Sequence, residues 1–521
     1  MNILITGATD GIGLALARFY AEHDIRPILV GRRDLAQLDH TLFTPERYCQ
    51  VDLATPESPA MIVAWLQAKQ IEQLDLVIHN AALGYVGDLI AQPISNINQL
   101  LQVNLWTPIA LTHSLYPWVA KAKGRFGFIS SVAAGLPGPN YAIYTVTKAA
   151  LEGFVRSWQI ELAASKAPVT AQIIRPGATR THMHTKSGAD PATMHWERFP
   201  TPERVASQIA HALRTDRRAF SIGVANGLAY TVGHTWPALV DRAMTPPFGV
   251  PALLEAVQAL ETPPHCVITG AADGIGRALA QVFAAAGYVV TGIDVDAPRA
   301  MQTQADIINA GGQARFLIAD LLAPNAVENV LDVLATRPPI TVFIHNAGIS
   351  AVGAFVDLEL AAQQRVLALN LNMPLRLTAA LLQAKRLAPQ SSLVFISSLS
   401  HFAGYPGASV YAASKDGVAA YARSLAVALA PQGMKVLTVY PGPTRTAHAR
   451  RYSPNNSREE RRMAPERLAQ LILASVQKGR RQLIPGINNQ AAAWLGRFFP
   501  PLIEQVMRRT TYDRLPAKPL E

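Results

Sequence analysis

The chain of 521 residues contains few cysteines and few charged residues. It has only two cysteines, Cys49 and Cys266, which excludes a framework of disulfide bonds and predicts two buried thiols in a reducing compartment. Charged residues make up 16% of the chain and hydrophobic residues 50%, which excludes an intrinsically disordered protein. The length is too great for one hydrophobic core and suits two.

Long apolar runs are also missing, since none reaches the roughly 18 residues that a transmembrane helix needs. The chain enters a strand-like segment, Ile3–Thr6, almost at once, so we expect no signal peptide and a cytoplasmic protein. The net charge is +11, but aromatic residues are not interleaved with the basic ones, so we expect no nucleic-acid partner. Peripheral contact with a membrane stays open, and we expect no metal.

The sequence repeats once, at a spacing of 263 to 267 residues. Ile5–Gly13 returns as Ile268–Gly276, and the pair Tyr144 and Lys148 returns as Tyr411 and Lys415. A constant order of partners at a nearly constant spacing predicts the duplication of a whole domain.

Short apolar runs alternate with helix-length segments in each copy, which predicts two tandem Rossmann-like α/β domains with doubly wound parallel sheets. We expect the domains at 1–245 and 265–521, joined by a linker over 246–264 that contains a helical piece, Ala252–Leu260. In the first copy the predicted strands are Ile3–Thr6, Pro27–Val30, Leu74–His79, Arg125–Ser130 and Thr170–Arg175, and two predicted helices are Leu14–Glu22 and Ala149–Ala164.

A glycine-rich turn follows the first predicted strand of each copy. Glycines let such a turn tighten and let its backbone approach a pyrophosphate at the positive end of the next helix. The first turn contains Gly7, Gly11, Ile12 and Gly13, and the second contains Gly270, Gly274, Ile275 and Gly276. The spacing Thr-Gly-x-x-x-Gly-x-Gly resembles that of the short-chain dehydrogenase/reductase family, and further motifs extend the resemblance over almost all of both copies.

A tyrosine and a lysine four residues apart can perform the acid–base step of carbonyl reduction. A helix places both on one face, and the charge of the lysine is expected to favour the phenolate of a tyrosine whose ordinary pKa is about 10. A serine thirteen residues before each tyrosine would hydrogen-bond the substrate oxygen. The predicted catalytic sets are Ser131, Tyr144 and Lys148, and Ser398, Tyr411 and Lys415.

The resemblance implies further roles. The lysine would also hold the nicotinamide ribose, and Asn104 and Asn370 match the helix asparagine that helps a water link this lysine to solvent. An aspartate after the third strand would contact adenine, and a Pro-Gly-x-x-x-Thr segment would lie at the nicotinamide. The implied cofactor residues are Asp52, Leu53, Asn80, Pro176, Gly177, Thr179 and Thr181, and Asp320, Leu321, Asn346, Pro441, Gly442, Thr444 and Thr446.

Cofactor preference is predicted from the end of the second strand. The second copy ends in Gly292-Ile293-Asp294, and a carboxylate there would bond ribose hydroxyls and repel a 2′-phosphate, so we expect NAD(H). The first copy reads Gly31-Arg32-Arg33, whose guanidinium groups suit a phosphate, so we expect NADP(H). Against this, Asp10 and Asp273 stand before the second glycines, where a basic residue would help.

The segments after the Pro-Gly motifs differ between the copies and predict different alcohol or ketone substrates. The first has an apolar lid of Met183, Met194, Trp196 and Phe199. The second is basic, and either forms a solvated loop or binds an anionic group; its arginines are Arg445, Arg450, Arg451, Arg458, Arg461 and Arg462. The apolar stretches Leu228–Met244 and Trp494–Met507 either cover the domain edges or contact a partner or membrane.

Three functions are compatible with these motifs. The first is a bifunctional oxidoreductase acting on carbonyl and alcohol groups, including hydrophobic ones. The second is a redox-neutral relay in which one domain oxidises with NAD and the other reduces with NADPH. The third is one catalytic domain beside a dinucleotide-binding regulatory domain. We expect the two copies to form an internal pseudo-dimer.

Overall fold

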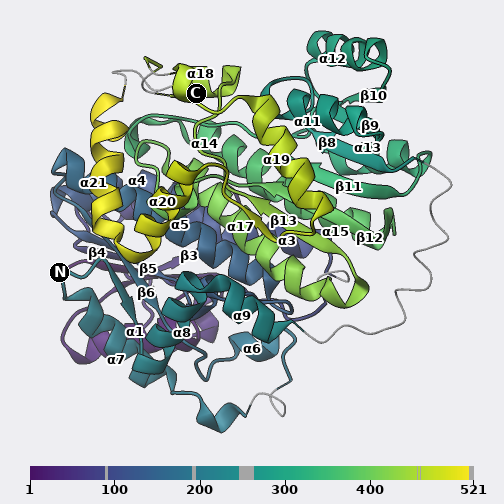
Figure 1. Cartoon of the computed structure of the whole chain (residues 1–521). Helices are drawn as coiled ribbons and strands as arrows, with labels where there is room; N and C mark the ends of the chain where they lie inside the picture. Colours follow the sequence, from purple (N-terminus) through teal and green to yellow (C-terminus); the bar gives the residue numbers. More distant parts are fainter. Residues whose placement is uncertain (89–91, 191–194, 246–262, 454–455, 458, 516–521) are drawn as a thin grey trace. The chain divides into compact units, whose positions relative to one another are not determined.

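The computed structural model describes residues 1–88, 92–190, 195–245, 263–453, 456–457 and 459–515 (Figure 1). Contacts divide the chain into two compact units, one of residues 1–87 and 95–237 and one of the described residues within 88–94 and 238–521. The predicted linker helix Ala252–Leu260, Met194 and Arg458 lie outside the described residues. The domain limits at 245 and 265 stay a prediction.

The N-terminal unit is built on a seven-stranded parallel sheet in the order β3-β2-β1-β4-β5-β6-β7. The first three strands are added outwards from β1 on one side of the sheet, and the next four are added outwards from β4 on the other side. The boundary between β1 and β4 is the switch point of a doubly wound sheet. Most of its strands are buried on both faces and therefore read as continuous apolar runs. The strands are β1 (Ile3–Thr6), β2 (Ile28–Gly31), β3 (Tyr48–Gln50), β4 (Leu76–His79), β5 (Arg125–Ile129), β6 (Thr170–Arg175) and β7 (Ala219–Ser221).

Helices pack on this sheet through their buried apolar residues. Leu16 of α1 and Ile209 of α7 belong to one core cluster with Ile5 of β1. The helices are α1 (Gly11–Glu22), α2 (Ser58–Ala68), α3 (Ile94–Leu101), α4 (Thr107–Lys121), α5 (Ala142–Ser165), α6 (Met183–Lys186), α7 (Pro202–Leu213) and α8 (Val224–Thr235); α9 (Pro237–Met244) follows them.

The second unit repeats the sheet in the order β10-β9-β8-β11-β12-β13-β14, again wholly parallel. The two equal strand orders confirm the predicted pair of Rossmann-like domains. The strands are β8 (His265–Thr269), β9 (Val289–Asp294), β10 (Gln313–Ile318), β11 (Ile340–His345), β12 (Leu387–Ile396), β13 (Lys435–Val439) and β14 (Gln482–Leu483).

The helices of the second unit follow the same plan, and Leu279 of α11 meets Ile472 of α19 in the core. They are α11 (Gly274–Ala285), α12 (Ala297–Asn309), α13 (Ala326–Ala335), α14 (Leu360–Leu367), α15 (Met373–Gln383), α16 (Ser400–Ala403), α17 (Ser409–Ala428), α18 (Ala447–Tyr452), α19 (Pro465–Gln477), α20 (Ile487–Phe498) and α21 (Pro500–Thr510). Among the described helices, none combines the length and the apolar character needed to cross a bilayer.

In the described part of each domain lies one π-helical turn, at Gln102–Trp106 between α3 and α4 and at Ala368–Asn372 between α14 and α15. A π-turn widens a helix by one residue and is common at functional sites. Here it carries the buried asparagines Asn104 and Asn370. Short 3-10 turns lie at Leu35–Gln37, Val132–Gly135, Trp196–Arg198, Phe355–Asp357, Ala430–Gln432, Glu459–Arg461 and Tyr512–Arg514.

Candidate active sites

The glycine turn joins β1 to α1 and has no room for side chains. Gly7 and Gly11 have positive φ values of 66° and 51°, a region that favours glycine. A Cβ at Gly13 would lie 2.1 Å from the carbonyl oxygen of Gly7, so helix and turn touch through their backbones. The second turn repeats this geometry with Gly270, Gly274 and Gly276.

An asparagine at the end of the fourth strand holds each turn. Asn80 donates from Nδ2 to the carbonyl oxygens of Thr6 at 3.0 Å and Gly7 at 3.3 Å. Asn346 makes the same bonds to Thr269 at 3.1 Å and Gly270 at 2.9 Å. Both residues were predicted from a cofactor-binding motif. In the structure each side chain is hydrogen-bonded to the backbone of the glycine turn.

The predicted Ser, Tyr and Lys come together in both domains. Lys148 Nζ donates a 2.8 Å hydrogen bond to the carbonyl oxygen of Ile129 and lies 5.7 Å from the centroid of the Tyr144 ring. A hydrogen bond links Tyr144 to Ser131. In the second domain Lys415 bonds Ile396 O at 3.0 Å and lies 5.6 Å from the Tyr411 ring, which is hydrogen-bonded to Ser398.

Burial controls the protonation of these groups. It raises the pKa of Tyr144 to about 12, against the hydrogen bond from Ser131, and it raises the pKa of Tyr411 as well. It lowers the pKa of Lys148 and of Lys415 to about 8. The expected lowering of the tyrosine pKa by the lysine charge is thus outweighed by desolvation of the phenolate, and each tyrosine is held protonated.

The π-turn asparagine connects three segments around the lysine. Asn104 Oδ1 accepts from Leu83 N at 2.7 Å, while its Nδ2 donates to Leu83 O at 2.8 Å and to Thr147 Oγ1 at 3.2 Å. Asn370 repeats the pattern with Ile349 at 2.9 and 2.8 Å and Ser414 Oγ at 3.2 Å. Both partner hydroxyls belong to the residue just before the lysine, so the asparagine positions the lysine-bearing helix.

The predicted Pro-Gly segment returns to the glycine turn. Pro176 O accepts a hydrogen bond from Val132 N at 3.1 Å, next to Ser131. A Cβ on Gly11 would lie 3.0 Å from Thr181 Cγ2, so Thr181 sits against the turn. Thr446 sits in the same way against Gly274. Thr179 and Thr444 bond the carbonyls of Gly177 and Gly442 at 3.1 Å within their own segments.

A cavity of about 1340 Å³ in the second domain collects most of the predicted residues on one surface. Gly276 and Asn370 are not part of its lining, but they contact the lining residues Gly270 and Ile349. The catalytic candidates therefore face the same space as the glycine turn. The predicted residues that line the cavity are Gly270, Gly274, Ile275, Asp294, Asp320, Leu321, Asn346, Ser398, Tyr411, Lys415, Pro441, Gly442, Thr444 and Thr446.

The strand register corrects one correspondence between the domains. Thr6 pairs with Val30 and Thr269 with Ile293, so Asp294 occupies the position of Gly31 and not of Arg33. Asp294 accepts hydrogen bonds from Ala272 N at 2.8 Å and Asp296 N at 3.1 Å.

At Gly31 a Cβ would lie 2.6 Å from Thr9 Cγ2, because Thr9 fills the space that Ala272 leaves open in the second domain. The first domain therefore lacks the acid, and a side chain at Gly31 would require Thr9 to shift.

Most of the other predicted residues at the strand ends form hydrogen bonds or ion pairs with nearby residues. Arg33 donates to Thr9 O at 3.1 Å and pairs with Asp10, while Arg32 is exposed. Asp52 accepts from Ala54 N at 3.0 Å, as Asp320 does from Leu322 N at 2.8 Å. Leu53 and Leu321 are buried.

A buried ion pair behind Lys148 was not predicted. The Glu152 carboxylate accepts two 2.8 Å bonds from Arg175, one of 2.6 Å from Ser130 and one of 2.7 Å from Tyr230. Glu152 also opposes the lowering of the Lys148 pKa. A charged residue within the apolar stretch of α5 was the one available signal.

The second domain has no such ion pair at the positions that match Glu152 and Arg175. Ala419 and Tyr440 occupy the positions of Glu152 and Arg175, and a His401–Asp416 contact of 2.9 Å lies near Lys415 instead.

The segments predicted to select substrates also differ. Arg461 and Arg462 line the cavity of the second domain, whereas Arg450 pairs with Glu459 at 2.8 Å. In the first domain, the ring of Phe199 lies 5.9 Å from that of His184.

A sequence model of the family "short chain dehydrogenase" matches residues 1–192 and 264–457. The chain belongs to this family. Dehydrogenase/reductase SDR family member 4 of Bos taurus is 30% identical over 230 residues, 41% of this chain and 80% of that protein. Cyclopentanol dehydrogenase of Comamonas testosteroni is 30% identical over 177 residues, 34% of this chain and 71% of that protein.

Among solved structures, the short-chain dehydrogenase of Sphingobium yanoikuyae in complex with NADPH is similar at 30% identity and a TM-score of 0.41, covering 44% of this chain and 91% of that one. The family match and the folds of both domains identify the chain as a tandem short-chain dehydrogenase/reductase, an oxidoreductase that acts on CH–OH and C=O groups.

Proposed function

We propose that both domains are catalytic and that each interconverts a carbonyl and an alcohol with its own Ser–Tyr–Lys set. The observation that carries this proposal is the repeated lysine geometry, with Nζ on the last carbonyl of the fifth strand at 2.8 and 3.0 Å and under the tyrosine ring at 5.7 and 5.6 Å. A copy without catalytic function would have no need to keep a buried cation in this place.

Each side chain has a distinct task in this proposal. The tyrosine, held protonated, donates its proton to the substrate oxygen in reduction and accepts one in oxidation. The serine hydrogen-bonds the same oxygen, and the lysine stabilises the phenolate that forms. A nicotinamide dinucleotide supplies or accepts the hydride when bound, with its pyrophosphate at the glycine turn and its ribose at the lysine.

The first domain would use NADP(H) and the second NAD(H). Arg32 and Arg33 follow β2, where Gly31 carries no carboxylate, whereas Asp294 faces the cavity at the position that matches Gly31. A 2′-phosphate would be attracted at the first site and repelled at the second.

This contrast also supports a second candidate function, a redox-neutral relay. One domain would oxidise an alcohol with NAD, and the other would reduce a ketone with NADPH, so that a hydroxyl is inverted or moved. The substrates would be small alcohols or ketones, the class of the Comamonas relative, or more hydrophobic ones. The two free, buried cysteines fit action in the cytoplasm.

Two tyrosine variants of the full chain test the proposal. A panel of alcohols and ketones, lipid-like ones included, is screened while NADH and NADPH are monitored separately. Tyr144→Phe should abolish one activity and Tyr411→Phe another. If one variant leaves every turnover intact, that domain is not catalytic, and if both variants abolish the same net conversion, the relay is favoured.

A further inference from the structure

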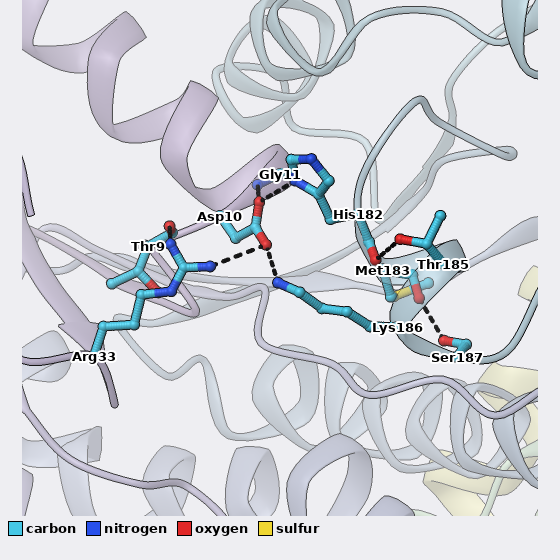
Figure 2. A network of polar contacts seen from close by, with 9 residues as sticks. All are labelled: Thr9, Asp10, Gly11, Arg33, His182, Met183, Thr185, Lys186 and Ser187. Atoms are coloured by element: carbon cyan, nitrogen blue, oxygen red, sulfur yellow. Dashed lines mark hydrogen bonds and ion pairs between the residues drawn. The ribbon is translucent and has the colours of Figure 1, made fainter. Parts of the chain in front are cut away.

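The glycine turn of the first domain contains a carboxylate surrounded by cations (Figure 2). Asp10 Oδ2 contacts Lys186 Nζ at 2.5 Å and Arg33 Nη2 at 3.4 Å. Asp10 Oδ1 contacts His182 Nδ1 at 3.2 Å and accepts from Gly11 N at 2.8 Å. Two fixed positive charges and an imidazole thus surround one negative charge at the turn.

The side chains around Asp10 come from distant parts of the chain. Arg33 follows β2, whereas His182 and Lys186 belong to α6 and the residue before it, in the segment that follows β6. Thr181, next to His182, packs on Gly11, so the whole segment is seated on the turn. Lys186 and Arg33 approach the same oxygen of Asp10, so the Lys186 ammonium lies close to the guanidinium of Arg33, the second residue after β2.

We propose that Lys186, assisted by His182, is a specificity-determining residue that recognises the 2′-phosphate of the cofactor in the first domain. The proposal rests on the NADP(H) assignment made above. Asp10 stands where a basic residue of the turn would favour a phosphate, and Lys186 supplies that positive charge from another element. Together with Arg33 and the exposed Arg32, Lys186 leaves an excess of positive charge around Asp10.

Asp10 itself is ionised in this cluster. Burial acts to raise the pKa of the Asp10 carboxyl group, but hydrogen bonds from Lys186 and His182 lower this pKa below its ordinary value. The carboxylate therefore holds the cations Lys186 and Arg33 in place before a phosphate arrives, and this preorganisation reduces the loss of side-chain freedom on binding.

The second domain has the opposite charge at the same place. Within the described residues the only charged partner of Asp273 is Arg299, at 3.8 Å, and Arg299 also contacts Asp296 at 3.3 Å. Asp294 accepts hydrogen bonds from the backbone of Ala272, the neighbour of Asp273, and from that of Asp296, so carboxylates outnumber the one guanidinium at this turn. Ala447 occupies the position of His182, so this contact has no equivalent there. Arg451 occupies the position of Lys186, but its guanidinium lies 5.2 Å from the centroid of the Tyr452 ring, and the charged partner of Asp273 is Arg299 instead.

The test compares Lys186→Gln with Lys186→Arg in the full chain. Binding of adenosine 2′,5′-bisphosphate, measured by calorimetry, should weaken about ten-fold in Lys186→Gln and recover in Lys186→Arg. In a Tyr411→Phe background, where only the first site turns over, the KM for NADPH should rise by a similar factor and the KM for NADH by less than two-fold. Lys121→Gln removes an exposed lysine of the same domain that pairs with Glu72, and should change neither value.

The outcomes separate two failures. A wild-type chain that does not prefer NADPH at the first site would refute the cofactor assignment itself. A wild-type preference that persists in Lys186→Gln would refute the role of Lys186 alone. An equal rise of KM for both cofactors would also overturn the proposal, because it would place Lys186 on the pyrophosphate that both cofactors share.

Discussion

The ammonium group of Lys148 donates its 2.8 Å hydrogen bond to the carbonyl oxygen of Ile129, the last residue of β5. Ser131 follows two residues later, so one strand end orients both the lysine and the serine. The lysine thus has a fixed position under Tyr144 that does not depend on a surface rotamer. Lys415 and Ser398 have the same relation to Ile396 in the second domain.

Lys148→Ala should reduce turnover more than Ser131→Ala in the same domain. In the proposed mechanism the lysine would stabilise the phenolate and hold the ribose, whereas the serine would only orient the substrate oxygen. We expect a loss of about 10²- to 10⁴-fold in kcat, accompanied by weaker cofactor binding. Steady-state kinetics with a surrogate ketone in a Tyr411→Phe background measures both. A lysine variant with normal cofactor affinity would contradict the dual role.

Lys415→Met should change how the stability of the second domain depends on pH. The pKa of Lys415 is about 8 in the folded protein and 10.5 ordinarily, so the unfolded chain binds more protons between these values. The stability of the wild type should therefore rise relative to the variant, by about 3 kcal/mol in total, as the pH increases through this range. Calorimetry of both proteins from pH 7 to 10 measures the difference. A constant difference would show that the lysine is not desolvated.

Asn370→Ala should destabilise the second domain by about 2–4 kcal/mol, because it removes a buried amide that bonds both backbone polar groups of the half-buried Ile349. Asn370→Asp keeps the acceptor for Ile349 N but loses both donated bonds, and should fall between the wild type and the alanine variant. Urea unfolding gives the ranking. If Asn370→Ala were as stable as the wild type, the π-turn would not depend on this side chain.

Replacing Asp294-Val295 by Gly-Arg, the pair at the matching positions of the first domain, should shift the second site towards NADPH. Loss of the carboxylate and gain of a guanidinium should change the NADPH/NADH preference by roughly ten- to a hundred-fold, or 1–3 kcal/mol. In the first domain, Arg32→Ala should weaken NADPH binding. Cofactor titrations of the full chain in Tyr144→Phe and Tyr411→Phe backgrounds assign each effect to its site. Equal affinity of both wild-type sites for both cofactors would refute the assignment of NADP(H) to the first domain and NAD(H) to the second.

Arg175→Met should destabilise the first domain by about 3–5 kcal/mol, because Glu152 would remain buried without a counter-charge. The double variant Glu152→Ala with Arg175→Tyr imitates the second domain and should recover at least half of that loss. Thermal unfolding compares the two. A double variant as unstable as Arg175→Met would mean that packing around Arg175, and not its charge, is what matters.

The fold was predictable because its signals are local. Ile3–Thr6 and Thr170–Arg175 coincide with β1 and β6, since a strand buried on both faces is an uninterrupted apolar run. The predicted helix Ala149–Ala164 starts too late, because α5 begins at Ala142. The segment Thr145–Thr147 is β-branched and a weak helix former on its own, and its burial against the sheet overrides that preference.

The site was predictable where chemistry requires a fixed spacing, as for Tyr144 and Lys148 on one helix. It was not predictable where partners meet only through the tertiary fold. Asp10 and Lys186 are 176 residues apart, and no periodicity in the sequence connects them. Glu152 and Arg175 likewise belong to different elements, α5 and β6, and their pairing replaces an alanine and a tyrosine at the same depth of the second domain.

The methyl group of Thr9 against Gly31 has a consequence for the history of the duplicated chain. An acid at the end of β2 would place its Cβ 2.6 Å from Thr9 Cγ2, so the Thr9 side chain has to move before the acid fits. The other copy has an alanine at the position of Thr9, without this methyl group. The cost of an acid at Gly31 therefore depends on a second residue, and this coupling would help a difference between the two strand ends to persist even without continued selection for it.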